Sequence, residues 1–434
     1  MLYDRKLSSN EKAFEILNRC ADSSNIVTIS RIKGLFTAEI LRQVLDIIQH
    51  EHPWLNSRIV GDLDNLSFET GTSKIPLRIE EKEYAEQYQE VVSQELNQKM
   101  QSAQILIRTV LVKISKDKHL SYLITTTHHA ISDGLSCMSL HSQIFKYCQR
   151  LASGEIIDEI NIRPPLPPFT ELLSARMQRF RSKLKLFIFL FKYQLESIKY
   201  KPQVFEMEKY VPLKERSCGM IQKRLNNEKT TQLKKLCKSN NTTVHNAICA
   251  AMLLASARKL VISTEMNIQL KCQSTIDLRK RIQPVIRDEV LGVFTSTIKT
   301  FHNINKNTNF WELAREIKQK LDIDLKKDDI FNKLFILDKH YNFLIENKKI
   351  SNSTSVNVTN IGQVSIPKIY GHFELEEISF IPTIKLVTSL VAVSTFQGTM
   401  ILNFPYIEPC ISRETMETFA NNVIYSLLNI AVNY

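Results

Sequence analysis

Two adjacent histidines, an aspartate and a glycine stand at a spacing that suits proton-transfer chemistry. His128 and His129 are followed, after three further residues, by Asp133 and Gly134. A histidine near its unperturbed pKa of about 6.5 can take a proton at neutral pH and return it later. An alcohol or amine that attacks a thioester needs such a base. Because the chain has no G-x-S-x-G nucleophile elbow, we expect direct transfer rather than a covalent acyl-enzyme.

These residues lie between a predicted strand and a predicted helix. The apolar, β-branched runs at residues 105–112 and 120–126 flank a turn-like segment at 115–118, which is typical of a β-hairpin. A helical pattern opens at Leu135, and the glycine before it is expected to permit a sharp bend. Side chains alternate between the faces of a strand, so only one histidine can face a given cavity. A lone histidine pair is usually structural and a lone Asp-Gly usually a turn, but their joint spacing favours a catalytic site.

The length of the chain and one proline-rich segment predict two lobes. A chain of 434 residues is too long for one ordinary core. The segment Arg163–Pro168 cannot form a helix or a central strand, so it is expected to be an extended connector. We therefore predict a first lobe at residues 1–152, a connector at 153–215 and a second lobe at 216–434. Strands and helices alternate in both halves without a parallel βαβ series or a Gly-rich phosphate loop, which indicates an α/β fold.

Two further segments suggest contacts between the lobes or with a ligand. Residues 176–192 are basic at the ends and almost entirely apolar at the centre. This pattern predicts a helix between the lobes that is buried on one side; contact with a membrane surface or a long acyl chain is the alternative. Residues 290–298 are predicted to form a strand, in which Gly292 marks a close approach of backbone or ligand.

Composition narrows the classes of partner and compartment. A net charge of +12 fits either a soluble basic surface or an anionic partner, such as a phosphopantetheine-bearing carrier protein or a coenzyme A thioester. No Lys/Arg block is interleaved with aromatic residues, so no nucleic-acid partner is expected. None of the eight cysteines lies in a C-x-x-C pair, which predicts neither a zinc site nor disulfides and indicates a reducing, cytoplasmic setting. We expect a monomer with no signal peptide and no membrane span, since no window reaches about 18 apolar residues.

The stretch from His128 to Gly134 resembles the HHxxxDG signature of the chloramphenicol-acetyltransferase-like superfamily. This superfamily includes nonribosomal peptide condensation domains and polyketide-associated acyltransferases. Four further segments look most like its phthiocerol dimycocerosyl transferase branch: Arg5–Glu11, His52–Leu55, Asp277–Arg279 and Thr359–Gly362. The resemblance covers nearly the whole chain. The DFGWG motif of plant acyltransferases is absent, which argues against the plant branch.

The resemblance implies two α/β sandwich lobes with a tunnel between them. The pantetheine arm of the donor would enter this tunnel from one face, and the acceptor from the other. The resemblance also implies that His129 is the general base and that His128 and Gly134 support the loop. Asp133 would be structural and would pair with an arginine.

The arginine that pairs with this aspartate is the least determined part of the predicted site. Arg279 is our candidate, because it ends one of the segments that resemble the family. Condensation domains often carry an arginine directly after the leucine of the segment that corresponds to His52–Leu55. In this chain Asn56 takes that place, and Arg58 follows two positions later.

The sequence leaves three functions open. The favoured one is an O-acyltransferase that moves an acyl group from acyl-coenzyme A or an acyl-phosphopantetheine carrier protein to a hydroxyl of a lipid, polyketide or other secondary metabolite. It needs no bound cofactor or metal. The second is a free-standing condensation enzyme that forms an amide, and the third is a catalytically silent module that docks a carrier protein. In each case the second lobe, around Gly292 and Asn360, is expected to form the acceptor side of the tunnel.

Overall fold

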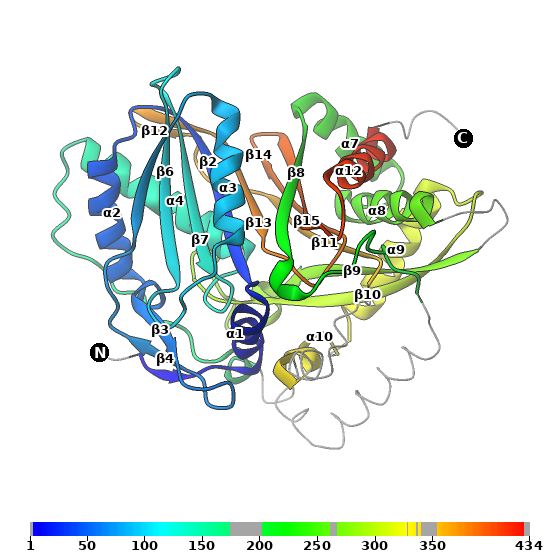
Figure 1. Cartoon of the computed structure of the whole chain (residues 1–434), viewed down its shortest axis with the longest axis horizontal. Helices are drawn as coiled ribbons and strands as arrows, with labels where there is room; N and C mark the ends of the chain where they lie inside the picture. Colours follow the sequence, from blue (N-terminus) through cyan, green and yellow to red (C-terminus); the bar gives the residue numbers. More distant parts are fainter. Residues whose placement is uncertain are drawn as a thin grey trace.

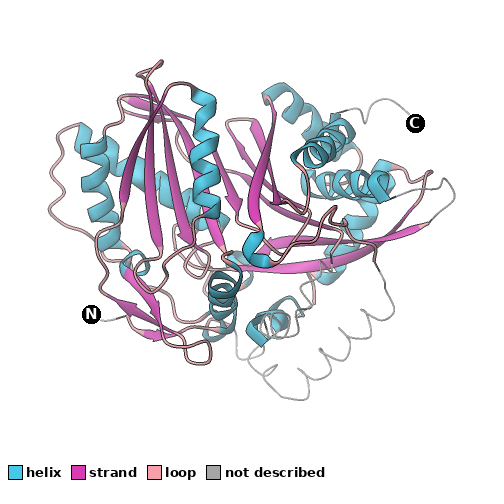
Figure 2. Ribbon diagram, in the orientation of Figure 1, coloured by secondary structure: helices cyan, strands magenta, loops and turns pink. Residues whose placement is uncertain are grey.

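The computed structural model describes residues 3–173, 202–260, 267–327, 329–335, 337–339 and 354–428. Within this part the chain forms two six-stranded sheets that stand side by side, each with its own helices (Figure 1). Helices and strands are interleaved in both halves (Figure 2). The predicted α/β fold with two lobes is therefore confirmed, whereas the tunnel stays a prediction.

The first sheet places the histidine pair at the end of a central strand. Its strands, in spatial order, are β12 (Ile369–Tyr370), β13 (Phe373–Pro382), β2 (Asn25–Gly34), β7 (Leu120–His128), β6 (Ile107–Ile114) and β5 (Leu77–Lys82). All neighbours are antiparallel except β5 and β6. The antiparallel pairing of β6 with β7 confirms the predicted hairpin.

Helices cover both faces of the first sheet because its central strands are apolar on both sides. These helices are α1 (Ser9–Ala21), α2 (Ala38–Glu51), α3 (Tyr88–Asn97) and α4 (Gly134–Ala152). In β7, Leu123 belongs to the apolar cluster under α2 and α4, while the adjacent Ile124 belongs to the cluster under α3. Thr37 caps α2 through its side chain, and the helix expected from Leu135 is confirmed as α4.

The second sheet is mixed, with its helices gathered on one face (Figure 1). Its strands, in spatial order, are β10 (Thr295–Ile304), β9 (Ile268–Asp277), β11 (Val356–Gln363), β14 (Leu390–Phe396), β15 (Thr399–Glu408) and β8 (Ser217–Leu225). The strand β11 runs parallel to both β9 and β14. The helices of this half are α7 (Asn227–Ser239), α8 (Val244–Leu260), α9 (Phe310–Asp324), α10 (Asp329–Asn332) and α12 (Arg413–Leu428). A small third sheet contains β1 (Arg5–Lys6), β3 (Ser57–Val60) and β4 (Ser67–Thr70).

The second half of the sequence contributes two strands to the first sheet. Strands β12 and β13 come from the second half, yet β13 pairs along its length with β2 of the first. Side chains then tie β13 back to the second sheet: Ser394 Oγ donates to the carbonyl of Ile378 (3.1 Å), and Asn403 Nδ2 donates to the carbonyl of Phe380 (2.9 Å). The predicted second lobe at residues 216–434 therefore needs one exception, since residues 369–382 complete the first sheet.

Three other predictions have different outcomes. The proline segment lies in a stretch without helix or strand between α4 and residue 169, as expected of a connector. The strand predicted at 290–298 begins only at Thr295, because the residues before it leave the ladder to contact the loop after β7. The basic helix predicted at 176–192 lies outside the described residues. Among the helices that are described, none is long and apolar enough to cross a membrane.

Truncating β13 should destabilise both halves together. Ile378 is fully buried between β2 and the second sheet, so Ile378→Ala should lower the free energy of unfolding by about 2–5 kcal/mol. Ile369→Ala, in the neighbouring β12 and 68% exposed, is the control and should cost no more than about 0.5 kcal/mol. Urea unfolding followed by circular dichroism measures both. Two separate transitions in the Ile378 variant, with only one of them shifted, would contradict a shared core.

Candidate active site

The first histidine of the motif is held inside the protein. His128 ends β7 with its side chain fully buried. Its Nδ1 accepts a hydrogen bond from the backbone N–H of Ala130 (3.0 Å), so its proton must lie on Nε2. That nitrogen is 3.0 Å from Oε2 of Glu15 on α1. His128 therefore fixes the start of the loop against α1 and faces away from any substrate.

Glu15 is the buried acceptor on which this end of the loop depends. It is fully buried, and it accepts hydrogen bonds from Ser102 Oγ (2.7 Å) and Arg19 Nε (2.6 Å). Burial alone would raise the pKa of Glu15, but the hydrogen bonds that it accepts from His128, Ser102 and Arg19 hold it below its usual value. Glu15 therefore stays ionised and keeps the Nε2 proton of His128 pointed toward α1.

The second histidine has the geometry of a general base. His129 Nδ1 donates to the carbonyl oxygen of Ser132 (2.8 Å), which leaves Nε2 as the unprotonated nitrogen. Its ring is only partly buried, and it stacks on Phe14 of α1 with ring centroids 3.9 Å apart and an interplanar angle of 11°. Its backbone N–H donates to the carbonyl of Ser24 (2.9 Å). Desolvation lowers the pKa of His129, so the ring is neutral at physiological pH.

The far end of the loop is fixed by a buried ion pair that joins the two halves of the chain. Arg279 Nη1 and Nη2 donate to Oδ2 and Oδ1 of Asp133 at 2.8 and 2.9 Å. Oδ1 also accepts the N–H of Ser136 (2.9 Å), which makes Asp133 the N-cap of α4, and Oδ2 accepts the N–H of Phe294 (3.0 Å). Each carboxylate oxygen therefore has two donors, one of them charged. We call this set of contacts the Asp133–Arg279 pair.

The pair is ionised although it is buried. Burial would raise the pKa of Asp133, but the Arg279 guanidinium and the two backbone N–H groups lower it overall. The guanidinium also contacts Asp277 Oδ1 (3.1 Å) and Ser136 Oγ (2.8 Å), and it lies over the Phe294 ring. Because the folded-state pKa of Asp133 is depressed, its stabilisation is present above the unfolded value of about 3.9 and is lost as the pH falls through the folded value.

The glycine of the motif is needed for space rather than for a bend. Gly134 is the first residue of α4, and its φ is outside the left-handed range that favours glycine. A Cβ at this position would lie 3.0 Å from Cγ2 of Ile361 in β11 and 3.1 Å from the ring of Phe380 in β13. The expectation of a sharp bend is therefore wrong: the glycine allows the helix to begin in contact with strands of the second half.

The other predicted positions lie on three different elements. Gly292 is buried, and its carbonyl accepts a hydrogen bond from Ser136 Oγ (3.0 Å). A Cβ at this position would lie 2.6 Å from the Phe294 ring, so the predicted close approach is confirmed, while its place on the acceptor side stays a prediction. Asn360 lies in β11, where its Oδ1 accepts the N–H of Gly362 (2.9 Å). Arg58, the other arginine near the conserved segment of the family, pairs with Glu69 on the small third sheet.

Sequence reasoning missed the contribution of α1. Phe14 and Glu15 contact the two histidines from the same helix, but nothing in their local sequence distinguishes them from ordinary residues of an amphipathic helix. Ser24, whose carbonyl holds the backbone of His129, has a φ of +88°. The one available signal is the capping box of Ser8 and Glu11, which fixes where α1 begins and therefore which residues share a face.

The part of the chain that the structure describes contains no candidate metal site. There, no group of three or more His, Cys, Asp or Glu side chains is arranged to hold a metal ion. The functional groups brought together are one neutral imidazole, its backbone acceptor and a buried ion pair. This arrangement can accept a proton from a substrate, hold it and return it.

Comparison with known protein families gives one match, which lies in the second half of the chain. Residues 214–408 match the family model described as phthiocerol/phthiodiolone dimycocerosyl transferase C-terminus. No curated protein sequence matches the chain.

Similar solved structures cover almost the whole chain. Polyketide synthase associated protein 5 from Mycobacterium tuberculosis is 16% identical, with a TM-score of 0.70, and the match covers 99% of this chain and 98% of that one. TRI3 trichothecene 15-O-acetyltransferase from Fusarium sporotrichioides is 13% identical, with a TM-score of 0.74 and coverage of 98% and 95%. The first condensation domain of the CDA synthetase is 11% identical, with a TM-score of 0.72 and coverage of 99% and 96%. At these identities the likeness shows the fold alone.

Replacing Arg279 should lower the free energy of unfolding far more than replacing an exposed arginine. Arg279→Ala leaves the Asp133 carboxylate buried without its counter-charge, so we expect a loss of about 3–5 kcal/mol in the free energy of unfolding. Arg58→Ala, which breaks the half-exposed pair with Glu69, is the matched control and should cost about 0–1 kcal/mol. Urea unfolding at neutral pH measures both. Equal losses in the two variants would show that the pair does not hold the loop.

Proposed function

We propose that this chain, which belongs to the chloramphenicol-acetyltransferase-like superfamily of acyltransferases and condensation domains, moves an acyl group from a thioester to a hydroxyl. His129 is the general base of this transfer. The proposal depends mainly on the protonation of the His129 ring. Nδ1 is committed to the carbonyl of Ser132, so Nε2 is the basic nitrogen, and burial keeps the ring neutral.

The proposed reaction is a single direct displacement. Nε2 of His129 removes the proton of the acceptor hydroxyl while its oxygen attacks the thioester carbonyl carbon. The resulting tetrahedral intermediate breaks its C–S bond, and the thiolate takes the proton back from the imidazolium. An ester and a free thiol leave, and the histidine is neutral again. The stacked Phe14 ring and the Ser132 carbonyl keep the imidazole in one orientation through both proton transfers.

The remaining motif residues act through His129 rather than on the substrate. His128 is fully buried against Glu15, and Asp133 is fully occupied by its four donors, so neither has a free group to offer a substrate. Their role is to hold the two ends of the loop. A covalent acyl-enzyme is not required, because the base can act directly on the acceptor.

The donor we favour is an acyl group on coenzyme A or on the phosphopantetheine arm of a carrier protein. The match to the phthiocerol dimycocerosyl transferase family supports acyl transfer, and the name of the trichothecene relative specifies an O-acetyl product. The net charge of +12 suits an anionic donor of either kind. The likeness to condensation domains keeps amide formation as the second candidate.

Replacing the base should abolish transfer and leave the fold intact. His129→Ala is expected to lower kcat/KM at least 100-fold, because a positioned general base contributes about 10²–10⁴-fold. The assay supplies a panel of acyl-coenzyme A and acyl-pantetheine donors with a long-chain alcohol and the matching amine, and it reads both products by mass spectrometry. His119→Ala, at the exposed far end of β7, is the control and should keep full activity.

Each outcome of this assay assigns one of the three functions. Ester formed by the wild type and lost in His129→Ala supports the proposal. Amide as the main product assigns a condensation enzyme. Binding of a carrier protein with no turnover across the panel assigns a docking module. Full activity in His129→Ala would contradict the mechanism.

The rate of transfer should hold at mildly acidic pH. The base is active in its neutral form, and burial lowers its pKa below the ordinary value of about 6.5. We therefore expect kcat/KM to be flat between about pH 6.5 and 8 and to fall only below 6.5, as His129 takes up a proton. A pH profile of thiol release measures this. An acidic limb at or above pH 6.5 would show that another group is the base.

A further inference from the structure

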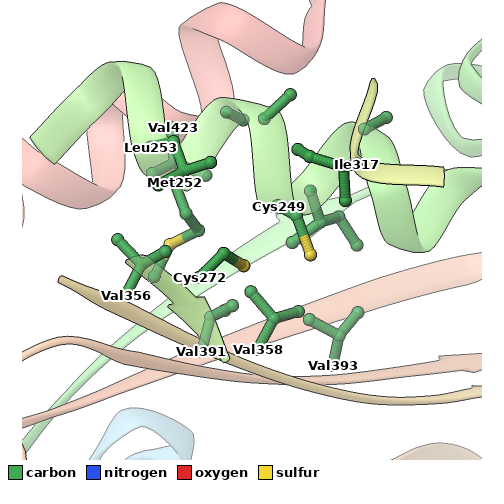
Figure 3. Packing of buried hydrophobic residues seen from close by; sticks show 14 of the residues in the cluster. Cys249, Met252, Leu253, Cys272, Ile317, Val356, Val358, Val391, Val393 and Val423 are labelled. Carbon is green, nitrogen blue, oxygen red and sulfur yellow. The ribbon is translucent and has the colours of Figure 1, made fainter. Parts of the chain in front are cut away.

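A second cluster of nucleophilic and ionisable side chains lies in the core of the second half. His245 and Cys249 are one helical turn apart on α8, and Cys272 and Ser274 share one face of β9. In Figure 3 the sulfur atoms of Cys249 and Cys272 lie between the helix and the sheet, among aliphatic side chains. None of these four residues belongs to the loop or the ion pair described above.

The four side chains form a connected polar network. His245 Nε2 is 2.9 Å from Ser274 Oγ and 3.5 Å from Cys249 Sγ. Cys249 Sγ is 3.6 Å from Ser274 Oγ, so the imidazole, the hydroxyl and the thiol contact one another in a triangle. Cys272 lies two residues before Ser274 on the same face of β9, and in Figure 3 its sulfur points into the same space between the helix and the sheet as that of Cys249. A cysteine that only fills space needs none of these partners.

The two sulfurs differ in their chemistry. Burial would raise the pKa of Cys249, but hydrogen bonds from Cys272 and Ser274 and the charge of His245 lower it overall. The pKa of Cys272 is raised, first by its hydrogen bond to Cys249 and then by burial. Because Cys249 is also the sulfur in contact with the His245 imidazole, we expect it to react first. A nucleophilic thiolate with a neighbouring resolving thiol has this pattern.

Burial limits the kind of reagent that can reach the pair. Both sulfurs are fully buried and Ser274 is nearly so, while His245 is partly exposed and forms the outer side of the cluster. We expect a reagent to approach from the side of His245, where a small molecule would meet less hindrance than a bulky thiol reagent. We propose that Cys249 and Cys272 are a dithiol that a small hydroperoxide oxidises to a disulfide, with Cys249 as the attacking sulfur and His245 as its base.

The chemistry balances with hydrogen peroxide as the oxidant. His245 takes the proton of Cys249, and the thiolate attacks one peroxide oxygen. The O–O bond breaks, and the departing hydroxide takes the proton from His245 and leaves as water, which gives a sulfenic acid on Cys249. The Cys272 sulfur then attacks Cys249 Sγ, and the sulfenic oxygen leaves with the Cys272 proton as a second water. Two thiols lose two electrons and the peroxide is reduced to two waters.

The other cysteines provide the comparison. Cys20 is the one described cysteine that is not fully buried, but burial raises its pKa and it has no histidine partner among its described contacts. Cys148 is buried like Cys249, and burial raises its pKa strongly. If exposure governed oxidation, Cys20 would react first. If the network governs it, Cys249 reacts first.

Peptide mapping of the native wild-type chain tests this directly. The reduced protein is treated with a few equivalents of hydrogen peroxide at pH 7, its remaining thiols are blocked under denaturing conditions, and its peptides are read by mass spectrometry. We expect loss of two thiols and a Cys249–Cys272 cross-linked peptide before any oxidation of Cys20. In Cys272→Ala, dimedone added together with the denaturant after the peroxide step should instead trap a sulfenic acid on Cys249. Cys148→Ala is the matched control and should form the disulfide at the wild-type rate.

A parallel reaction separates size from reactivity. N-ethylmaleimide on the native protein should label Cys20 and leave Cys249 unlabelled, because a bulky reagent would meet more hindrance on the side of His245. Oxidation of Cys20 with Cys249 and Cys272 still reduced would overturn the proposal, as would a cross-link that forms only after unfolding. Neither readout depends on acyl transfer, so the test stands apart from the proposed function.

Discussion

The buried contact between Asp133 and Arg279 is the interaction on which the candidate site depends. Removing two charges from water costs several kcal/mol each, and the pair offsets this only through good geometry and full hydrogen bonding. Both conditions are met: each oxygen of Asp133 has one charged and one backbone donor, and the guanidinium also contacts Asp277 and Ser136. Three segments meet here: the loop after β7, the start of α4, and the β9–β10 connection. None of these segments can form the site alone.

The pair explains how a short loop can hold a base in one orientation. The loop from His128 to Asp133 is anchored at its start by the contact with Glu15 and at its end by Arg279. Between the anchors, the Nδ1 bond of His129 to Ser132 and the stacking on Phe14 fix the ring itself. Preorganisation of this kind lowers the entropic cost of bringing the base to the acceptor. The first half supplies the imidazole, and the second half fixes the loop that carries it.

Patterns within short stretches of the sequence predicted the elements that depend mainly on neighbouring residues. The β6–β7 hairpin and the helix from Leu135 both follow from residue patterns within short stretches of sequence. The motif and the segment Asp277–Arg279 identified both ends of the ion pair, because the family resemblance implied an arginine partner for Asp133. Contacts between distant segments were not accessible in this way. The pairing of β13 with β2, and the stacking of Phe14 on His129, join residues more than one hundred positions apart along the chain, and no periodicity reports such contacts.

The same limit explains why the role of Gly134 was misjudged. A glycine in a sequence indicates either a backbone conformation or a lack of space, and the choice depends on neighbours that come from elsewhere in the chain. For Gly134 those neighbours are Ile361 and Phe380, both from the second half. The pairing of β13 with β2 and the Asp133–Arg279 pair therefore have the same effect: both hold the two halves together beside His129. Wide opening of the two halves would have to break a buried ion pair and displace α4, so we expect the halves to stay in contact beside His129. If His129 is the base that we propose, its substrates would have to reach it without a large movement of the lobes.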